Sequence, residues 1–146
     1  MLLTSTGRYS GSLGVEWMMH KDLHQYESPE AFLVEFIPYL EATREEDWVQ
    51  DVVRRGGQNC LMGHFINFCE HDLDDNVAPS WDWFEQMVAT PYMVYPVNDG
   101  TDPDYPQGSA RERCIAFMKD ILSGTKPNTL RAMQEDYEEW KCRNHM

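Results

Sequence analysis

Apolar side chains recur at helical spacing along most of this chain, and short capping signals mark where the helices begin. The clearest case starts at Ser28, which can act as an N-cap, and Pro29, which suits the first position of a helix. Pro38 lies inside the apolar stripe that follows and is expected to kink or end the helix. The stripe comprises Phe32, Leu33, Phe36, Ile37 and Leu40.

Two capping boxes mark further helices. Thr43-Arg-Glu-Glu46 predicts a short helix that stops at Gly56-Gly57, and Ser109-Ala-Arg-Glu112 predicts one that ends just before Gly124. The apolar residues after the first box are Trp48, Val49, Val52 and Val53. Those after the second box are Cys114, Ile115, Met118, Ile121 and Leu122.

Three more helices follow from simpler signals. Asn59 can cap a helix that is apolar over much of its circumference, and we expect this helix to be the central, most buried one. Ser80 can cap the next helix, which closes before Pro91. A final amphipathic helix begins near Pro127 and carries Glu135, Asp136, Glu138 and Glu139 on its polar face.

These signals predict a mainly α fold with a single compact domain of about six helices over residues 15–146. A short strand or small hairpin near residues 93–97 is the β-structure that the sequence allows. Residues 1–14 are rich in Gly, Ser and Thr and are expected to form a flexible N-terminal arm. One domain is the default for 146 residues, which can bury a core without a metal or disulfide.

The formal net charge of −13, from 25 acidic and 12 basic residues, is the most unusual number in the composition. Such a surface repels phosphate backbones and anionic lipid headgroups, which argues against direct binding to nucleic acid or to a membrane. It attracts a protein with a basic surface, with fast and salt-sensitive association. No segment approaches the roughly 20 apolar residues of a membrane span, and we expect a cytoplasmic protein.

The acidic segment that begins at Asp72 resembles the start of a calcium loop, with oxygen ligands at its first, third and fifth positions. The resemblance fails at Val77, where a glycine is required, and at Trp83, where a bidentate Glu should stand. We therefore expect a solvated acidic loop.

Two pairs of residues have the four-residue spacing that lets a helix bind a metal, Cys60 with His64 and His20 with His24. Neither pair lies in a HExxH or CxxC pattern, so a core cysteine with a hydrogen-bonded histidine is the preferred interpretation. We expect no metal and no other cofactor. A metal that combines both pairs remains an open alternative.

The cysteines are expected to be reduced and mostly buried, because they lie in helix-like contexts at wide spacings. A nucleophile built from Cys60 or Cys69 with His64 or His71 would also need an orienting acid and an oxyanion hole, for which there is no local signature. Gly56-Gly57 lacks the Lys and Ser/Thr of a phosphate-binding loop. The four cysteines are Cys60, Cys69, Cys114 and Cys142.

Acidic residues gather in four places, which are either solvated faces or parts of an anionic surface that imitates a nucleic-acid backbone. Whether they share one face is open. The clusters are Glu45, Glu46, Asp47 and Asp51; Glu70, Asp72, Asp74 and Asp75; Asp99, Asp102 and Asp104; and Glu135, Asp136, Glu138 and Glu139.

The segment Tyr95–Pro106, YPVNDGTDPDYP, is expected to connect two helices. Its prolines bias the backbone to extended geometry, and Asn98-Asp99-Gly100 supplies a turn. Turn chemistry leaves Tyr95, Asp102, Asp104 and Tyr105 unexplained, and these four are the first candidates for a contact surface. The candidate partner-binding residues are Tyr95, Asp99, Asp102, Asp104 and Tyr105, together with Glu135, Asp136, Glu138 and Glu139.

Three short motifs resemble a family of small uncharacterised proteins from actinobacteria, plasmids and phages. They are Asn59-Cys-Leu-Met-Gly-His64, Val97-Asn-Asp-Gly100 and the helix start Arg111-Glu-Arg113, within residues 59–122. The family pattern is a Cys-x-x-Gly helix, an Asn-Asp turn and a closing helix. The resemblance implies no reaction or cofactor, but it implies a mobile-element context, in which a small acidic protein is often an inhibitor of a host enzyme.

The leading hypothesis is an acidic, non-enzymatic interaction protein, plausibly phage-encoded, that inhibits a host nucleic-acid-handling or defence complex as a nucleic-acid mimic. An alternative is a small-ligand binder or enzyme with a pocket near residues 95–106, in which Asp99 acts as acid or base near His64 or Cys60. A third is a structural or assembly subunit or a homo-oligomer. An enzyme is less favoured than an interaction protein.

Overall fold

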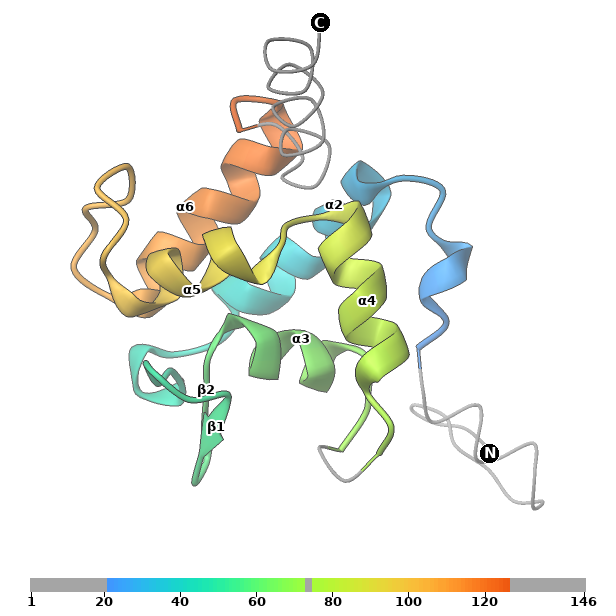
Figure 1. The fold of residues 1–146 in the computed structure, drawn as a ribbon, viewed down its shortest axis with the longest axis horizontal. Helices are drawn as coiled ribbons and strands as arrows, with labels where there is room; N and C mark the ends of the chain where they lie inside the picture. The colour runs from blue at the N-terminus through green and yellow to red at the C-terminus, as the bar shows by residue number, and fades with distance from the viewer. Residues whose placement is uncertain (1–20, 73–74, 127–146) are drawn as a thin grey trace, which may run out of the picture.

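The computed structural model describes residues 21–72 and 75–126. Their fold is mainly α-helical, as predicted, with a small antiparallel hairpin (Figure 1). The predicted arm at residues 1–14 and the final helix after Pro127 lie outside the described residues. The elements in chain order are η1 (Leu23–Gln25), α2 (Pro29–Glu41), η2 (Glu45–Asp47), β1 (Arg54–Arg55), β2 (Gln58–Asn59), α3 (Leu61–Phe68), α4 (Ala78–Met87), α5 (Pro91–Asp99) and α6 (Ala110–Ser123), where η denotes a short 3-10 helix.

Helix α3 is the central helix, which confirms the expectation from its apolar circumference. Each of its residues is buried except Asn67. Its Phe65 ring lies 5.8 Å from Phe32 of α2 and 4.8 Å from Phe84 of α4, centroid to centroid. Helix α6 packs on α2 and α5 on the other side of the core (Figure 1). Aromatic packing therefore joins the helices that surround α3.

The starts of α2 and α6 are those that the capping signals predict. Ser28 Oγ accepts a hydrogen bond from the Ala31 amide at 3.1 Å. In the second capping box, Ser109 Oγ accepts from the Glu112 amide at 3.1 Å and donates to the Glu112 carboxylate at 3.2 Å. These short-range bonds supply partners for amides that have none within the helix, so they are readable from sequence.

Two prolines lie inside helices without ending them. Helix α2 continues past Pro38 to Glu41, although we expected Pro38 to kink or end it. Helix α5 contains Pro96, so the strand considered near residues 93–97 is wrong. Each proline deprives the carbonyl four residues earlier of its helical bond, and those residues, Val34 and Tyr92, are 61% and 79% exposed. Water can reach these carbonyls, which explains why both helices tolerate the proline.

The helix predicted after Thr43 is also wrong. The chain forms only the short η2 there and then runs in irregular and extended conformations to the β1–β2 hairpin. Gly56-Gly57 connects the two strands instead of ending a helix, and Gly56 has a φ of 61°, as a two-residue hairpin turn requires. Thr43 Oγ1 accepts from the Trp48 indole at 2.9 Å. The aromatic and β-branched residues of this segment suit extended backbone as well as they suit a helix.

Two predicted caps are replaced by contacts from elsewhere in the chain. Asn59 belongs to β2, and the first amide of α3, that of Leu61, instead donates to Asn98 Oδ1 at 3.0 Å. Helix α4 begins at Ala78, and Ser80 Oγ lies 3.2 Å from Nε2 of His71. Within residues 21–72 and 75–126, no helix has the length and apolar character to cross a membrane.

Candidate functional site

One face of α5 carries large exposed side chains. Tyr92 and Tyr95 are 79% and 45% exposed, and Asp99 is half-buried. Their spacing of three and then four residues places them on the same side of the helix. Exposed tyrosines are typical of protein contact surfaces, where aromatic residues are enriched. The helix ends at Gly100, whose φ of 85° suits a glycine in the left-handed region.

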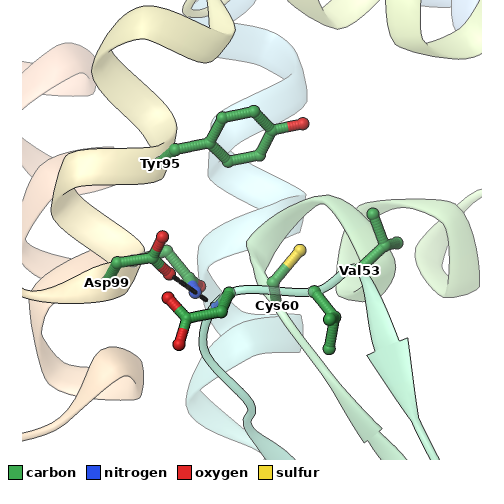
Figure 2. A pocket seen from close by; sticks show the side chains of 7 residues that line it. Val53, Cys60, Tyr95 and Asp99 are labelled. Atoms are coloured by element: carbon green, nitrogen blue, oxygen red, sulfur yellow. Dashed lines mark hydrogen bonds between the residues drawn. The ribbon is translucent and has the colours of Figure 1, made fainter.

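A cavity of about 210 Å³ lies between this face and the segment that precedes α3. Figure 2 shows Tyr95 and Asp99 on α5 at one side and Cys60 and Val53 at the other. Asp51 also lines it. The structure therefore brings Tyr95, Asp99 and Cys60 together, as the pocket alternative requires. The carboxylate of Asp51 is a second acidic group at this cavity.

Asn98 holds the walls of this cavity together. Its side chain is 1% exposed, and its Nδ2 donates to the Val49 carbonyl at 3.1 Å and to Asp99 Oδ1 at 3.1 Å. Its Oδ1 accepts the Leu61 amide at 3.0 Å. One buried amide thus joins α5, the start of α3 and the segment before β1. Buried polar groups of this kind fix relative position because each bond is costly to lose.

Asp51 has a left-handed backbone with a φ of 72°. Aspartate tolerates this conformation better than most residues, and the geometry aims the Asp51 amide at Asp99 Oδ1, 3.0 Å away. The bonds from Asp51 and Asn98 both end on Oδ1, so Oδ2 of Asp99 has no hydrogen-bond partner within the described part of the chain. One oxygen of Asp99 holds the loop, and the other can bind a ligand group.

The Cys60 thiol is a poor nucleophile in this environment. Burial raises its pKa, and the charge of Asp99 raises it further, whereas the backbone amides of Gly63 and Met62 act in the opposite direction. Because the thiolate is the reactive form, a raised pKa keeps the group unreactive at neutral pH. Cys60, Cys69 and Cys114 are free and buried, as expected, and Cys142 lies outside the described residues.

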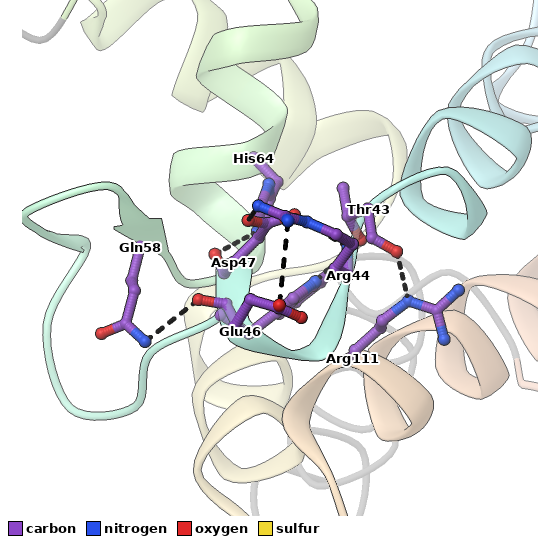
Figure 3. A network of polar contacts seen from close by, with 8 residues as sticks. Thr43, Arg44, Glu46, Asp47, Gln58, His64 and Arg111 are labelled. Atoms are coloured by element: carbon purple, nitrogen blue, oxygen red, sulfur yellow. Dashed lines mark hydrogen bonds and ion pairs between the residues drawn. The ribbon is translucent and has the colours of Figure 1, made fainter.

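His64 makes structural contacts with neighbouring residues and does not activate Cys60. Its Nε2 lies 3.1 Å from the Asp47 carbonyl (Figure 3). Its ring centroid is 4.3 Å from that of Trp48. Within residues 21–72 and 75–126, no group of three or more His, Cys, Asp or Glu side chains could hold a metal ion. His20, the partner of His24 in the other predicted pair, and Asp74 of the calcium-like segment lie outside the described residues.

Burial lowers the pKa of His64 from 6.5 to about 4. The unfolded chain therefore binds a proton on His64 more readily than the folded chain, and stability falls as the pH decreases from 6.5 towards 4. We expect this residue to make the free energy of unfolding about 2 kcal/mol smaller at pH 5 than at pH 7.5. Urea titrations of the wild type and His64→Gln test this. A His64→Gln variant with the same pH slope as the wild type would contradict it.

The other predicted contact residues do not share the cavity. Tyr105 is only 3% exposed, and its hydroxyl donates to Asp120 of α6 at 2.8 Å. Burial and this bond to Asp120 raise the pKa of Tyr105. Asp104 pairs with Lys126 at 2.9 Å, and Asp102 Oδ1 accepts the Asp104 amide at 2.9 Å. Tyr105 is therefore part of the core, whereas Asp102 and Asp104 organise the loop.

The predicted acidic face on the final helix, Glu135 to Glu139, lies outside the described residues. Tyr92, which belongs to the exposed face of α5, was not among the predicted contact residues. Helical spacing from Pro91 onwards would have placed Tyr92, Tyr95 and Asp99 on one side. Pro96 hid this pattern, because proline usually indicates the end of a helix.

A second hollow of about 200 Å³ lies between α4 and α5. The buried side chains of Met62 and Phe84 contribute to it, together with half-buried Trp81. Two acidic residues of α4, Asp82 and Glu85, also line this hollow. Tyr95 lines both hollows and is therefore the wall between them.

Within the described part of the chain, most of the basic side chains are engaged by the protein itself. Arg113 is 6% exposed and donates to the carbonyls of Val97, Asn98 and Gln107 at 2.8, 2.9 and 3.0 Å. Arg54 donates to the side-chain amides of Asn59 and Asn67. These two arginines pair with no carboxylate within the described residues. Lys21, Arg44, Arg111, Lys119 and Lys126 have internal contacts too, some of them shown in Figure 3.

The acidic residues around α5 consequently stay uncompensated. Asp51, Asp82, Glu85 and Asp99 form no ion pair with a basic side chain in the described part of the chain. No Lys or Arg lines either hollow. This face combines two exposed tyrosines with four carboxylates, and we call it the α5 face.

No family model matches this chain, and neither the curated proteins nor the solved structures contain a match.

Proposed function

We propose that this chain is an acidic, non-enzymatic interaction protein that binds a partner with a basic surface. The observation that supports the proposal is the uncompensated charge of the α5 face beside Tyr92 and Tyr95. A few residues carry most of the binding energy at protein interfaces, and tyrosine is one of the residue types enriched among them. Unpaired carboxylates accelerate the approach of a basic partner and orient it. Both kinds of group occur on this face.

An enzymatic role has less support. The Cys60 thiol has a raised pKa, and His64 is directed to the Asp47 carbonyl. A nucleophile and its base must lie within hydrogen-bonding distance of each other, or come within it when the substrate binds. These two side chains are committed to different contacts.

The partner that fits this chemistry is a host nucleic-acid-handling or defence complex, which the chain inhibits by occupying a basic groove. The net charge of −13 supports this choice. The setting that we propose is the cytoplasm, with the chain as a phage-encoded inhibitor. In this role the carboxylates stand where phosphates of the nucleic acid would lie, and the complex weakens as salt increases.

Affinity capture tests the proposal. The immobilised full chain is incubated, at about 50 mM NaCl, with a lysate of the organism that carries the gene. It is then washed at about 500 mM NaCl, which shortens the Debye length and weakens electrostatic attraction. We expect basic nucleic-acid-binding proteins to be retained at low salt and released at high salt. Absence of any salt-sensitive basic protein would contradict the proposal.

Two amide variants locate the surface in the same experiment. The first changes acidic residues of the α5 face (Asp82→Asn, Glu85→Gln, Asp99→Asn) and should lose the captured proteins, because the removed charges attract the partner. The matched control changes three exposed acidic residues elsewhere (Glu27→Gln, Glu30→Gln, Glu70→Gln) and should retain them. Equal losses from both variants would show that the α5 face is not the binding surface.

A second candidate function is a small-ligand binder that uses the 210 Å³ cavity. The observation that favours it is the meeting of Tyr95, Asp99 and Cys60 there. A thermal-shift screen against nucleotides and divalent metal ions separates this function from the first. A shift of several degrees that Asp99→Asn abolishes would favour the ligand-binding function. A third role, as an assembly subunit, would appear as self-association in light scattering across salt concentrations.

A further inference from the structure

We propose that the two hollows beside Tyr95 receive one short segment of the partner, with an apolar side chain in the α4–α5 hollow and a lysine or arginine side chain in the Asp51–Asp99 cavity. This inference rests on the proposed function and specifies the chemistry that the α5 face recognises. The occupant is a peptide segment that is both apolar and basic.

The α4–α5 hollow suits the apolar side chain. Trp81, Pro91 and Tyr95 supply the accessible apolar surface of this hollow. Met62 and Phe84, which are only 7% and 0% exposed, lie beneath them. The hollow measures about 200 Å³. Engineered apolar cavities of about 150 Å³ hold a benzene molecule, so a leucine or phenylalanine side chain fits this space. Burying it would remove apolar surface of both molecules from water.

The neighbouring cavity suits the cation. Asp51 and Asp99 both line it, and Oδ2 of Asp99 is unpaired within the described residues. A guanidinium or ammonium group can donate to such a carboxylate in a charge-assisted hydrogen bond. The Tyr95 ring on the wall offers a second favourable contact, because cations bind over aromatic faces.

Charge complementarity identifies the occupant. The carboxylates of Asp82 and Glu85 line the apolar hollow, and those of Asp51 and Asp99 line the other, with no lysine or arginine lining either one. An acidic segment would be repelled at both hollows, and a purely apolar segment would leave the Asp51–Asp99 cavity without a counter-charge. Tyr95 lines both hollows, so a single chain that crosses it reaches both.

An NMR titration of the full, ¹⁵N-labelled chain tests this inference. The probe is the synthetic peptide acetyl-Leu-Gly-Arg-amide, with acetyl-Leu-Gly-Glu-amide and acetyl-Ala-Gly-Arg-amide as controls. We expect millimolar binding that shifts the amides of Asp51 and Asp99 and the indole N–H of Trp81. Each control peptide should bind about threefold more weakly or worse, since each lacks one of the two anchors.

Variants of the protein complete the test. The Asp51 side chain makes no hydrogen bond within the described residues, so Asp51→Asn removes its charge alone and should lower the affinity for the Leu-Gly-Arg peptide about threefold. Glu30→Gln, on the exposed side of α2, should leave this affinity unchanged. Shifts confined to other surfaces, or equal affinity for the Arg and Glu peptides, would overturn the inference. Salt-sensitive capture of basic proteins can succeed when the peptide fails, so the proposed function and this inference can fail separately.

Discussion

Asn98→Ala is expected to lower the free energy of unfolding by about 3 to 5 kcal/mol. The substitution leaves the Leu61 amide and the Val49 carbonyl without their bonds at 3.0 and 3.1 Å from the Asn98 side chain. The Asn98 side chain is 1% exposed, so water cannot easily replace it. Each orphaned buried group costs about 1 to 3 kcal/mol, and the missing amide leaves a small void.

Urea denaturation of the wild type and Asn98→Ala measures this effect, with Asn76→Ala as the control. Asn76 is exposed in the segment before α4, and its removal should change stability by less than about 0.5 kcal/mol. A loss below about 1 kcal/mol in Asn98→Ala would mean that the two backbone groups find other partners. In that case Asn98 would not be the residue that joins the cavity walls.

Gly63→Ala is expected to destabilise the protein by about 2 kcal/mol or more, although alanine favours a helix. A Cβ at Gly63 would lie 2.6 Å from the Val53 carbonyl oxygen and 2.7 Å from Asn59 Oδ1. The first of these atoms belongs to the backbone, which cannot rotate away. In an unobstructed helix, Gly→Ala would raise the free energy of unfolding by about 1 kcal/mol. The close contacts with the segment before β1 and with β2 turn this expected gain in stability into a loss.

Gly108→Ala provides the control for this prediction. A Cβ at Gly108 would meet nothing within 4 Å, and the residue has no left-handed backbone. Its substitution should change the free energy of unfolding by less than about 0.5 kcal/mol. Gly63→Ala should also displace Val53 from the cavity wall and so lower the affinity for the Leu-Gly-Arg peptide. Unchanged or increased stability of Gly63→Ala would contradict the close packing of α3 on the hairpin.

The elements that sequence predicts well are those with local causes. Ser28 and Ser109 accept bonds from amides three residues away, so the starts of α2 and α6 could be read directly. The first amide of α3 bonds with Asn98, which is 37 residues distant, and no local pattern contains that information. The predicted caps at Asn59 and Ser80 failed because tertiary contacts outweighed intrinsic preference.

The prolines and glycines show the same limit. Pro38 and Pro96 normally indicate that a helix ends, yet both lie where the orphaned carbonyl belongs to an exposed residue. Whether that carbonyl meets water depends on the packing of the whole helix. Gly56-Gly57 fits a helix end and a hairpin turn equally well until the partner strand is known.

The candidate site was predicted in part. Tyr95 was identified because turn chemistry left it unexplained, and Asp99 was identified as a member of an acidic cluster and of the pocket alternative. The structure places both at one cavity. Tyr105 looked equivalent in sequence but is buried, because its hydroxyl finds Asp120 on α6. The role of Asp51 depends on its left-handed backbone and on the approach of α5, neither of which periodicity reports.

Competition with nucleic acid tests whether the α5 face occupies a basic groove of the partner. A fluorescently labelled nucleic acid is bound to the basic protein captured from the lysate, and its anisotropy is followed as the chain is added. We predict that the wild-type chain displaces the nucleic acid, that more chain is needed as NaCl increases, and that the variant with amides at Asp82, Glu85 and Asp99 displaces it poorly. Binding of the chain without displacement, or equal displacement by that variant, would show that the α5 face does not occupy the nucleic-acid groove.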